Sequence, residues 1–359
     1  MTTAAELASY ASSFPFFRNR IINGAMQINQ RGSTAVSAGT DNVYSVDRFN
    51  VGTAGGTATY TLNNAAEVPS GSGFAKSFHL DVSTADVSMD TSDGYYLRYK
   101  FEGQDLQFLC KGTSNTKNVT LSFWVKSPKA GIHIVELFDT DNTRHISKSY
   151  NVAVANTWQK VSLNFTGDTT GAFDNDNQLS LIINWWLAAG TNFTSGTLNT
   201  SWNAYTAANR AVGQVNIMDS TSNNFYITGV QLEEGTVATP FEHRPYGTEL
   251  ALCQRYFQIS PAYAYLPAAN GNATSVETNF FLPTPMRATP TFSTSTGSYD
   301  TSIYHPSVRA IGTGTPSSIS YATNSNIVRF IQGGFSGMTA VDQSCAFQSR
   351  KDILISAEL

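Results

Sequence analysis

The sequence predicts an all-β protein: a jelly-roll β-sandwich followed by a smaller antiparallel β domain, with a short helix joining the two. Three observations support this fold class. Strand-like segments, with period-2 alternation or many β-branched and aromatic residues, recur at regular short spacing. No helices of about 10–15 residues separate them, which excludes a parallel α/β architecture. Ser, Thr, Asn and Gly supply much of the polar share, which suits strands joined by turns.

The expected strands of the sandwich fill the first two thirds of the chain. In one of them, Leu121, Phe123 and Val125 are expected to face one way, and Ser122 and Trp124 the other. Residues 19–48 are expected to form a strand followed by a long loop. The segments with strand character are 57–62, 75–82, 94–102, 118–127, 131–139, 147–153, 159–165, 178–187 and 224–232.

The stretch from Phe225 to Phe257 joins the two β-rich parts. Its beginning alternates like a strand and places residues 226, 228, 230 and 232 on one face. Thr248 is the expected N-cap of a helix over 249–257. We therefore expect an N-terminal anchor segment at 1–18, a jelly-roll domain at 19–246 and a C-terminal β domain at 247–359. The expected strands of that last domain are 276–282, 289–295, 317–321, 327–330, 343–350 and 352–356.

Composition narrows the function classes. Charged residues are 13% of the chain, against about 25% in an average protein. A hydrophobic share of 41% nevertheless argues against disorder. The net charge of −4 gives no reason to expect a nucleic-acid partner. The sequence has no apolar run of about 18 residues and no secretory signal pattern, so we expect no membrane insertion.

No motif for catalysis, a cofactor or a metal stands out. The three cysteines have neither a disulfide-framework pattern nor metal-ligand spacing. None of the five histidines lies in a catalytic motif, so we expect a protein that is not an enzyme and needs no cofactor. The pairs Asp139/Asp141 and Asp174/Asp176 are interpreted as turn formers. A glycosidase pair and, at 174–177, a calcium site are the alternatives, and no metal is assigned.

Four patches of sequence carry a family resemblance. They are NRIINGAMQ at 19–27 with QRG at 30–32, YSVDRF at 44–49, GVQLEEGTVATPFEHRPYGTELALCQRYF at 229–257, and FLPTPMRATPT at 281–291. In this order they resemble bacteriophage virion proteins of the tail-fibre, head-fibre or capsid-decoration kind, which carry a jelly roll similar to carbohydrate-binding modules.

The resemblance implies a structural role in the particle. It implies assembly in the host bacterial cytoplasm, location in the virion, other virion proteins as partners, and a homotrimer. The alternative is a receptor-binding tail-fibre adhesin that recognises host surface polysaccharide.

Two groups of residues are candidates for contacts. The first is an attachment group in the N-terminal segment, because exposed apolar side chains need a partner surface: Leu7, Phe14, Phe16 and Phe17. The second is a glycan group, because sugars bind flat rings beside amide groups: Trp186, Trp202, Tyr205 and Asn203. Trp185 and Trp186 are adjacent, so one is expected to point inward and the other outward. The alternative is that these tryptophans pack in the core or at a subunit interface. A further aromatic cluster is Tyr95, Tyr96 and Tyr99.

Overall fold

The computed structural model describes residues 17–261, 265–272, 275–294, 300–304, 309–313, 316–321, 327–332, 344–349 and 352–359. The chain divides into two compact units, one extending to Tyr246 and including Leu359, the other from Gly247 to Glu358. Strands dominate both units, and the strand pairings among the described residues are antiparallel. The predicted all-β class is therefore confirmed.

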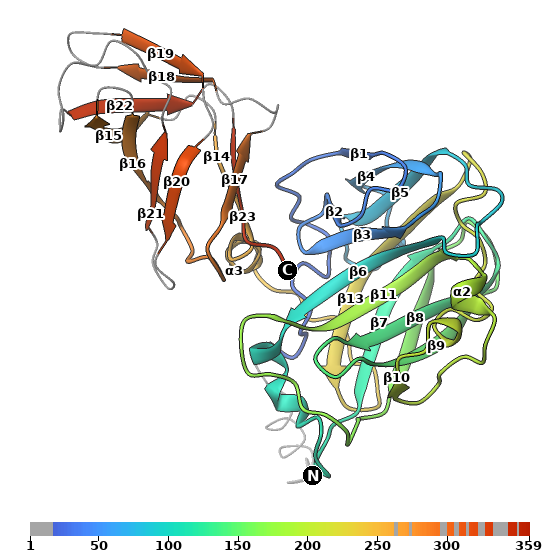
Figure 1. Ribbon diagram of the computed structural model, residues 1–359. Coiled ribbons are helices and arrows are strands. Elements are labelled where there is room, and N and C mark those ends of the chain that lie inside the picture. The colour runs from blue at the N-terminus through green and yellow to red at the C-terminus, as the bar shows by residue number, and fades with distance from the viewer. Residues whose placement is uncertain are drawn as a thin grey trace. The chain divides into compact units, whose positions relative to one another are not determined.

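The first unit is a sandwich of two sheets (Figure 1). The six-stranded sheet has the order β1 (Thr34–Val36), β4 (Thr59–Ala65), β5 (Ser77–Thr84), β13 (Asn224–Glu234), β7 (Val119–Lys126) and β10 (Gln159–Phe165). The seven-stranded sheet has the order β12 (Asn203–Ala204), β9 (Arg144–Val152), β8 (Gly131–Asp139), β11 (Leu179–Ala189), β6 (Gly94–Glu102), β3 (Phe49–Ala54) and β2 (Val43–Tyr44). Its short helices are η1 (Gly103–Leu109), α2 (Thr191–Thr194) and η2 (Ala207–Asn209).

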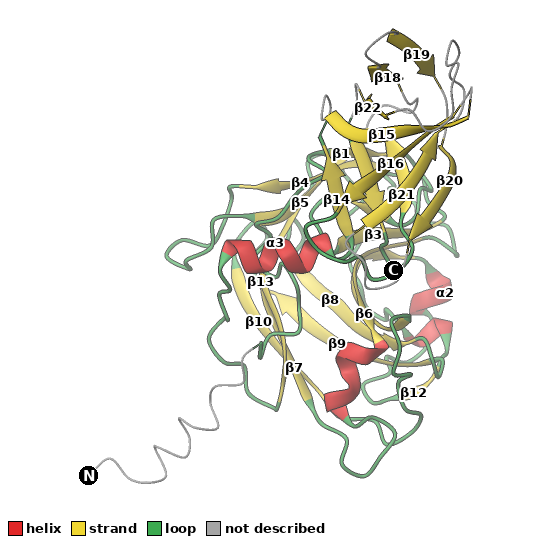
Figure 2. Ribbon diagram, turned by 90° about the vertical axis from the view of Figure 1, so that its left-hand side faces the viewer, coloured by secondary structure: helices red, strands yellow, loops and turns green. Residues whose placement is uncertain are grey.

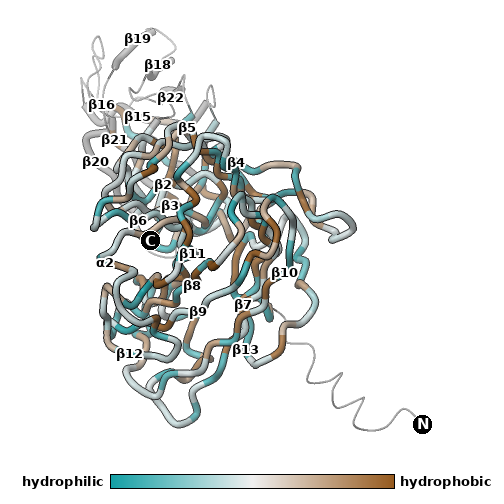
Figure 3. Tube along the Cα trace, turned by 90° about the vertical axis from the view of Figure 1, so that its right-hand side faces the viewer, coloured by the Kyte–Doolittle hydropathy of each residue, from teal (hydrophilic) through white to brown (hydrophobic). Residues whose placement is uncertain are grey.

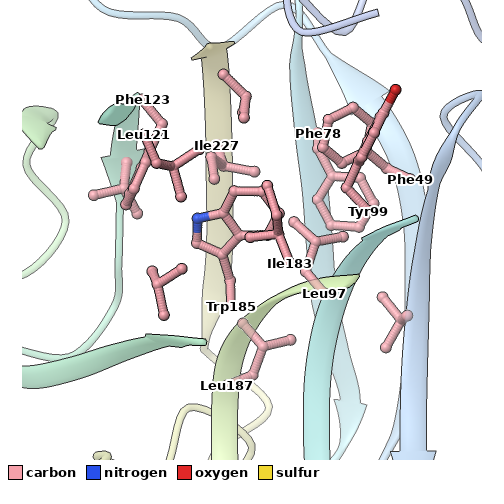
Figure 4. Packing of buried hydrophobic residues seen from close by; sticks show 14 of the residues in the cluster. Phe49, Phe78, Leu97, Tyr99, Leu121, Phe123, Ile183, Trp185, Leu187 and Ile227 are labelled. Carbon is pink, nitrogen blue, oxygen red and sulfur yellow. The ribbon is translucent and has the colours of Figure 1, made fainter. Parts of the chain in front are cut away.

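One continuous hydrophobic core fills the space between the two sheets. Trp185 of β11 lies at its centre and points toward Phe123 of β7 and Ile227 of β13 in the facing sheet (Figure 4). Its ring centroid is 5.9 Å from that of Phe123 and 6.3 Å from that of Phe49. The outer neighbour, Trp186, belongs to a separate small cluster on the other face of β11. The two tryptophans thus point to opposite sides, as the alternation predicts.

Sequence alternation positions most of these strands. Leu121, Phe123 and Val125 are fully buried, whereas Trp124 and Lys126 are only half-buried, as predicted for β7. Hydrophobic and hydrophilic residues are interleaved along the strands of the sandwich (Figure 3). The predicted strands 94–102, 131–139 and 159–165 coincide with β6, β8 and β10. Strand β3 and the short strands β1, β2 and β12 were not predicted from the sequence.

The prediction that residues 226, 228, 230 and 232 share one face of β13 is wrong, because the pattern changes phase within the strand. Phe225 and Ile227 point into the core before Gly229, and Val230 and Leu232 do so after it. The strand changes phase because the pairing with β7 shifts between Thr228 and Gln231, a β-bulge. Gly229 adopts φ +63° there, a left-handed conformation that favours glycine.

The N-terminal segment differs from the expected strand and loop. Residues 17–33 contain no strand, yet Ile21, Met26 and Ile28 are fully buried. Side chains of Asn19 and Asn23, rather than a strand ladder, satisfy much of the backbone of this segment.

The second unit begins in the joining helix. This helix, α3 (Tyr246–Gln254), begins and ends earlier than predicted (Figure 2). Pro245, whose fixed φ suits a helix start, precedes it directly, and Phe257 already belongs to a strand. A three-stranded sheet has the order β14 (Phe257–Ser260), β23 (Ile353–Ser356) and β17 (Thr291–Thr294). A seven-stranded sheet has the order β19 (Arg309–Thr313), β18 (Asp300–Tyr304), β22 (Ser344–Ser349), β15 (Tyr265–Asn272), β16 (Ser275–Phe281), β21 (Ile327–Gln332) and β20 (Pro316–Tyr321).

Among the described residues, the structure has no helix that is long and apolar enough to span a membrane.

Candidate functional site

The outer face of the seven-stranded sheet carries a row of polar side chains across neighbouring strands. Asn184 of β11 lies opposite Arg98 of β6 on one side and Glu136 of β8 on the other. Asn50 of β3 continues the row beyond Arg98. Asn184 and Glu136 are almost completely buried. Such a row is unusual in a chain with only 13% charged residues, and it marks this face as the first candidate site.

Glu136 is the centre of this row. Its carboxylate accepts two hydrogen bonds of 2.8 Å from the Arg210 guanidinium, a bidentate pair. Asn184 Nδ2 donates to it at 3.0 Å, and His145 Nδ1 lies 3.1 Å from Oε1. The Glu136 and His145 side chains are both 0% exposed.

Charge compensation keeps Glu136 ionised. Burial alone would raise its pKa, but the charge and hydrogen bonds of Arg210, with those of His145, lower the pKa to about 2. Burial likewise opposes the charge of Arg210, and Glu136 more than offsets it and raises the pKa of that guanidinium. The pair is therefore ionic at neutral pH.

Four aromatic rings surround the Arg210 guanidinium. Its central carbon lies 5.0 Å from the Trp186 ring, 5.4 Å from Tyr205, and 5.7 Å from Phe138 and from Phe193. These distances are typical of cation–π contacts. Two of the four rings, Trp186 and Tyr205, were predicted to bind glycans. In this structure both contact a cation of the chain itself.

The position of Trp186 corrects the expected sugar platform. Its side chain is 1% exposed, because Phe193 and Arg210 cover it on the outer face of β11. Tyr205 is 39% exposed, and Asn203 in the edge strand β12 is also exposed. Tyr205 and Asn203 therefore lie at the rim of the covered site, where solvent reaches them.

Residues 190–216 form an arm that is fastened to the outer face through several contacts. Ser147 Oγ donates to the Arg210 carbonyl at 2.8 Å, and Gln214 Oε1 accepts from the Ile134 amide at 2.8 Å. The Asn199 side chain lies 2.7 Å from His145 Nε2. Residues 190–216 are thus fixed against the outer face of the sheet, in part through Arg210.

Trp202 does not join Trp186 and Tyr205. Its indole nitrogen donates to the Thr166 carbonyl at 2.8 Å, and its ring lies 5.4 Å from Lys111 Nζ. Lys111 pairs with the buried carboxylates of Asp139 and Asp168, at 2.5 and 3.2 Å. The predicted glycan group is therefore split between two ion-pair sites, each with its own internal cation.

The remaining candidates have structural contacts. Tyr95 and Tyr99 are buried, and Tyr96 lies half-buried beside Trp186 at 5.0 Å. Of the four aspartates in the predicted pairs 139/141 and 174/176, Asp139 pairs with Lys111. Asp141 accepts from the Asp174 amide at 3.0 Å, and Asp176 accepts from the Gln178 amide at 2.9 Å. Within the described part of the chain, no group of three or more His, Cys, Asp or Glu side chains could hold a metal.

A second cluster joins the N-terminal segment to the end of the sandwich. We call it the clamp: Arg18, Asn19, Gln231, Glu233, Thr239, Glu242 and Arg244. Glu242 accepts from the amides of Phe17 at 3.1 Å and Asn19 at 2.6 Å. Arg244 donates to the carbonyls of Asn19 and Ile21. Arg18 pairs with the buried Glu233 at 3.2 Å.

Asn19 of the clamp is 2% exposed. Its Oδ1 accepts from the amides of Ile21 at 2.9 Å and Leu232 at 3.1 Å, and its Nδ2 donates to the Val230 carbonyl at 3.1 Å. Gln231 Oε1 accepts from the Glu242 amide at 2.9 Å.

Three of the four patches that carry the family resemblance meet around this segment. Asn23, in the first patch, donates to the carbonyls of Ile28 at 2.8 Å and Asp47 at 2.9 Å. Asp47, in the second patch, pairs with Arg31 at 3.2 Å. Patches up to about 220 residues apart thus share one hydrogen-bonded structure, as the Asn19–Glu242 bond with a separation of 223 shows.

One of the predicted attachment residues is described. Phe17 is 44% exposed and lies 5.2 Å from the Arg244 guanidinium. Leu7, Phe14 and Phe16 lie outside the described residues.

Comparison with known proteins gives remote matches of structure. No family model and no curated protein matches the sequence. Among solved structures, the enzymatically active domain of tailspike protein 4 from bacteriophage CBA120 has 15% identity and a TM-score of 0.31, over 61% of this chain and 22% of that chain. A family 11 carbohydrate-binding module of a Clostridium thermocellum cellulosomal cellulase has 12% identity and a TM-score of 0.29, over 58% of this chain and 97% of that module. A family 61 carbohydrate-binding module in complex with β-1,4-galactotriose has 8% identity and a TM-score of 0.29, over 61% of this chain and 99% of that module.

The sequence analysis missed the charged residues at the centres of both ion-pair sites. Glu136 lies inside the predicted strand 131–139, where a carboxylate interrupts the apolar run 134–138. That interruption was a usable signal, because a buried carboxylate needs a partner. Arg210 and Lys111 lie in loops, and no local pattern could have matched them to Glu136 and Asp139.

Proposed function

We propose that the protein is a non-catalytic structural component of a bacteriophage virion, a fibre or decoration protein. In this proposal the N-terminal segment attaches the protein to the particle, and the β units are displayed at the surface. The clamp is the observation that carries the proposal. It fixes residues 17–23 to residues 230–244, so the segment that precedes the sandwich and the linker that follows it leave the domain at one place.

The clamp also gives the family resemblance a physical basis. The resemblance to virion proteins rests on patches that are distant in sequence, and three of them serve one purpose, which is to hold the N-terminal segment. A chain that is attached through this segment needs it to be anchored firmly in its own fold. The aromatic residues that were predicted to bind glycans contact Arg210 and Lys111, which favours the structural role over the adhesin.

Removal of residues 1–16 tests the proposal. The full chain and the chain from Phe17 onward would be supplied to assembling particles, and their amounts in purified virions measured by mass spectrometry. We expect a fixed stoichiometry for the full chain and loss of incorporation for the shortened chain, with equal urea midpoints for both. Equal incorporation of the two, or absence of the full chain from virions, contradicts attachment through this segment.

A second candidate function is recognition of a host surface glycan, and one observation favours it. Tyr205 and Asn203 are both exposed, two residues apart at the edge of the seven-stranded sheet, and a ring and an amide are groups that a sugar needs. Under this proposal Tyr205→Ala weakens binding to host polysaccharide at least tenfold. Tyr246→Ala is the matched control, because Tyr246 is 59% exposed and lies outside this edge.

A further inference from the structure

The oxygen atoms around Lys111 form a closed cage. The ammonium group lies 2.5 Å from Asp139 Oδ2, 3.2 Å from Asp168 Oδ2, 2.9 Å from the Thr170 carbonyl and 2.7 Å from the Gly171 carbonyl. The side chains of Lys111, Asp139 and Asp168 are 3%, 0% and 4% exposed. Four oxygens, one from the end of β8 and three from the loop after β10, thus surround one cationic nitrogen away from solvent.

Contacts other than those of Lys111 also hold the cage. Asp139 accepts from the Asn142 amide at 3.0 Å and from its side chain. Asp168 accepts from Arg144 Nε at 2.7 Å and from the Thr170 amide at 3.0 Å. At Gly171, φ is +72°, and an added Cβ would collide with the Asn142 side chain, so glycine allows the loops to come this close. The oxygens are therefore positioned by the loops themselves.

We infer that this cage is a binding site for a monovalent amine cation, which the chain fills with the ammonium group of its own Lys111. Two features select this chemistry over a divalent metal. Three of the four oxygens lie 2.7–3.2 Å from the ammonium nitrogen, which fits N–H···O hydrogen bonds and exceeds the roughly 2.3–2.6 Å that Ca²⁺ takes. Asp139 and Asp168 carry two negative charges, and Arg144, which pairs with Asp168, balances one of them. Removal of the Lys111 charge therefore leaves one net negative charge, which a single monovalent ion balances.

Lys111 then acts as a tethered ion that joins the end of β8 to the loop after β10. A hollow lined by Lys111, Asp168, Leu109, Phe173 and Trp202 lies beside it and encloses about 350 Å³, including its open mouth. Lys111 and Asp168 both line this hollow, so the position of the ammonium group borders it. The inference is independent of any role in a virion.

Chemical rescue of Lys111→Ala tests the inference. The variant should unfold about 10 °C below the wild type, because it leaves the buried Asp139 carboxylate without its cation. Methylammonium chloride should restore most of this loss, whereas tetramethylammonium chloride at equal ionic strength should not, because it cannot donate hydrogen bonds. CaCl₂ should restore less than methylammonium does.

Two further variants keep the test decisive. Lys111→Met fills the cage with an uncharged side chain of similar length, so its loss should not be rescued. Lys160→Ala removes an exposed lysine of β10 that does not line the hollow, and should change nothing. If Lys111→Ala does not fold, its refolding yield with each salt is the readout. No gain from methylammonium over tetramethylammonium in either readout overturns the inference.

Discussion

Two buried cations explain why the aromatic residues of the sandwich do not form an open platform. Arg210 is held by Glu136 and four rings, and Lys111 by Asp139, Asp168 and the rings of Phe173 and Trp202. In both cases a carboxylate on a strand or strand end meets a cation on a loop. The rings exclude water from each ion pair, which strengthens its hydrogen bonds. At the scale of single residues, the charges in this charge-poor chain therefore fasten loops to sheets.

The first prediction concerns Arg210. Arg210→Met leaves Glu136 buried without its bidentate partner, which we expect to cost about 3–5 kcal/mol in the free energy of unfolding measured with urea. Lys117→Met is the control, because the Lys117–Glu234 pair is exposed and should be worth less than about 1 kcal/mol. Equal effects of the two substitutions would show that the Arg210 pair does not stabilise the domain.

The second prediction concerns pH. The pKa of Glu136 falls from 4.5 to about 2 on folding, so its stabilisation is present above pH 4.5 and is lost as the pH falls toward 2. The shift corresponds to about 3 kcal/mol at neutral pH. The unfolding free energy of the wild type should therefore fall more steeply between pH 5 and pH 2 than that of Glu136→Gln. Parallel profiles of the two proteins would contradict the assigned shift.

At the scale of elements, sequence alternation works wherever the backbone stays regular. It predicted β6 and β10 because apolar and polar residues alternate in them without interruption, and it predicted β8 from its many β-branched and aromatic residues. It failed in β13 because the bulge at Gly229 changes which residues point inward, and a single glycine in a strand does not reveal the phase change. It also missed β15, whose Pro267 and Gly271 are unusual within a strand.

The third prediction tests the bulge. Gly229→Ala should destabilise the domain strongly, because Gly229 has φ +63° and an added Cβ would lie 2.5 Å from the Phe74 ring. Gly39→Ala is the matched control, with φ +68° and open space around the added carbon. We expect a loss of about 1 kcal/mol for Gly39→Ala from backbone strain alone, and at least twice that for Gly229→Ala, both measured by urea unfolding. Similar losses would mean that Phe74 moves aside at little cost.

At the scale of the whole sandwich, the clamp makes the N-terminal segment part of the fold. The sequence showed the patches involved but not their contacts, because residues 19 and 242 are neighbours only after folding. The contacts around Arg210 could not be predicted from the sequence either, because they too form only when the chain folds. Tyr205 and Asn203 could be recognised as exposed polar and aromatic residues of a loop, whereas the burial of Trp186 depends on Arg210, which lies in a different part of that loop.

The fourth prediction tests the clamp. Asn19→Ala leaves the amides of Ile21 and Leu232 and the carbonyl of Val230 without their partner, which we expect to cost about 3 kcal/mol. Hydrogen exchange should quicken first in residues 19–28. Asn203→Ala, an exposed asparagine whose side chain bonds to Ser201, should leave both quantities unchanged. Unchanged exchange in Asn19→Ala would show that other contacts hold the segment.

Cryo-electron microscopy of intact particles from the source of this sequence tests the central claim most directly. The proposal predicts density for the β-sandwich on the outside of the virion, joined to the capsid or tail through the residues that precede Phe17. Density of this kind would also show whether the Tyr205 edge faces solvent, as glycan recognition requires. Particles that lack the protein, or that contact it only through the sheet faces of the sandwich, would contradict attachment through the N-terminal segment.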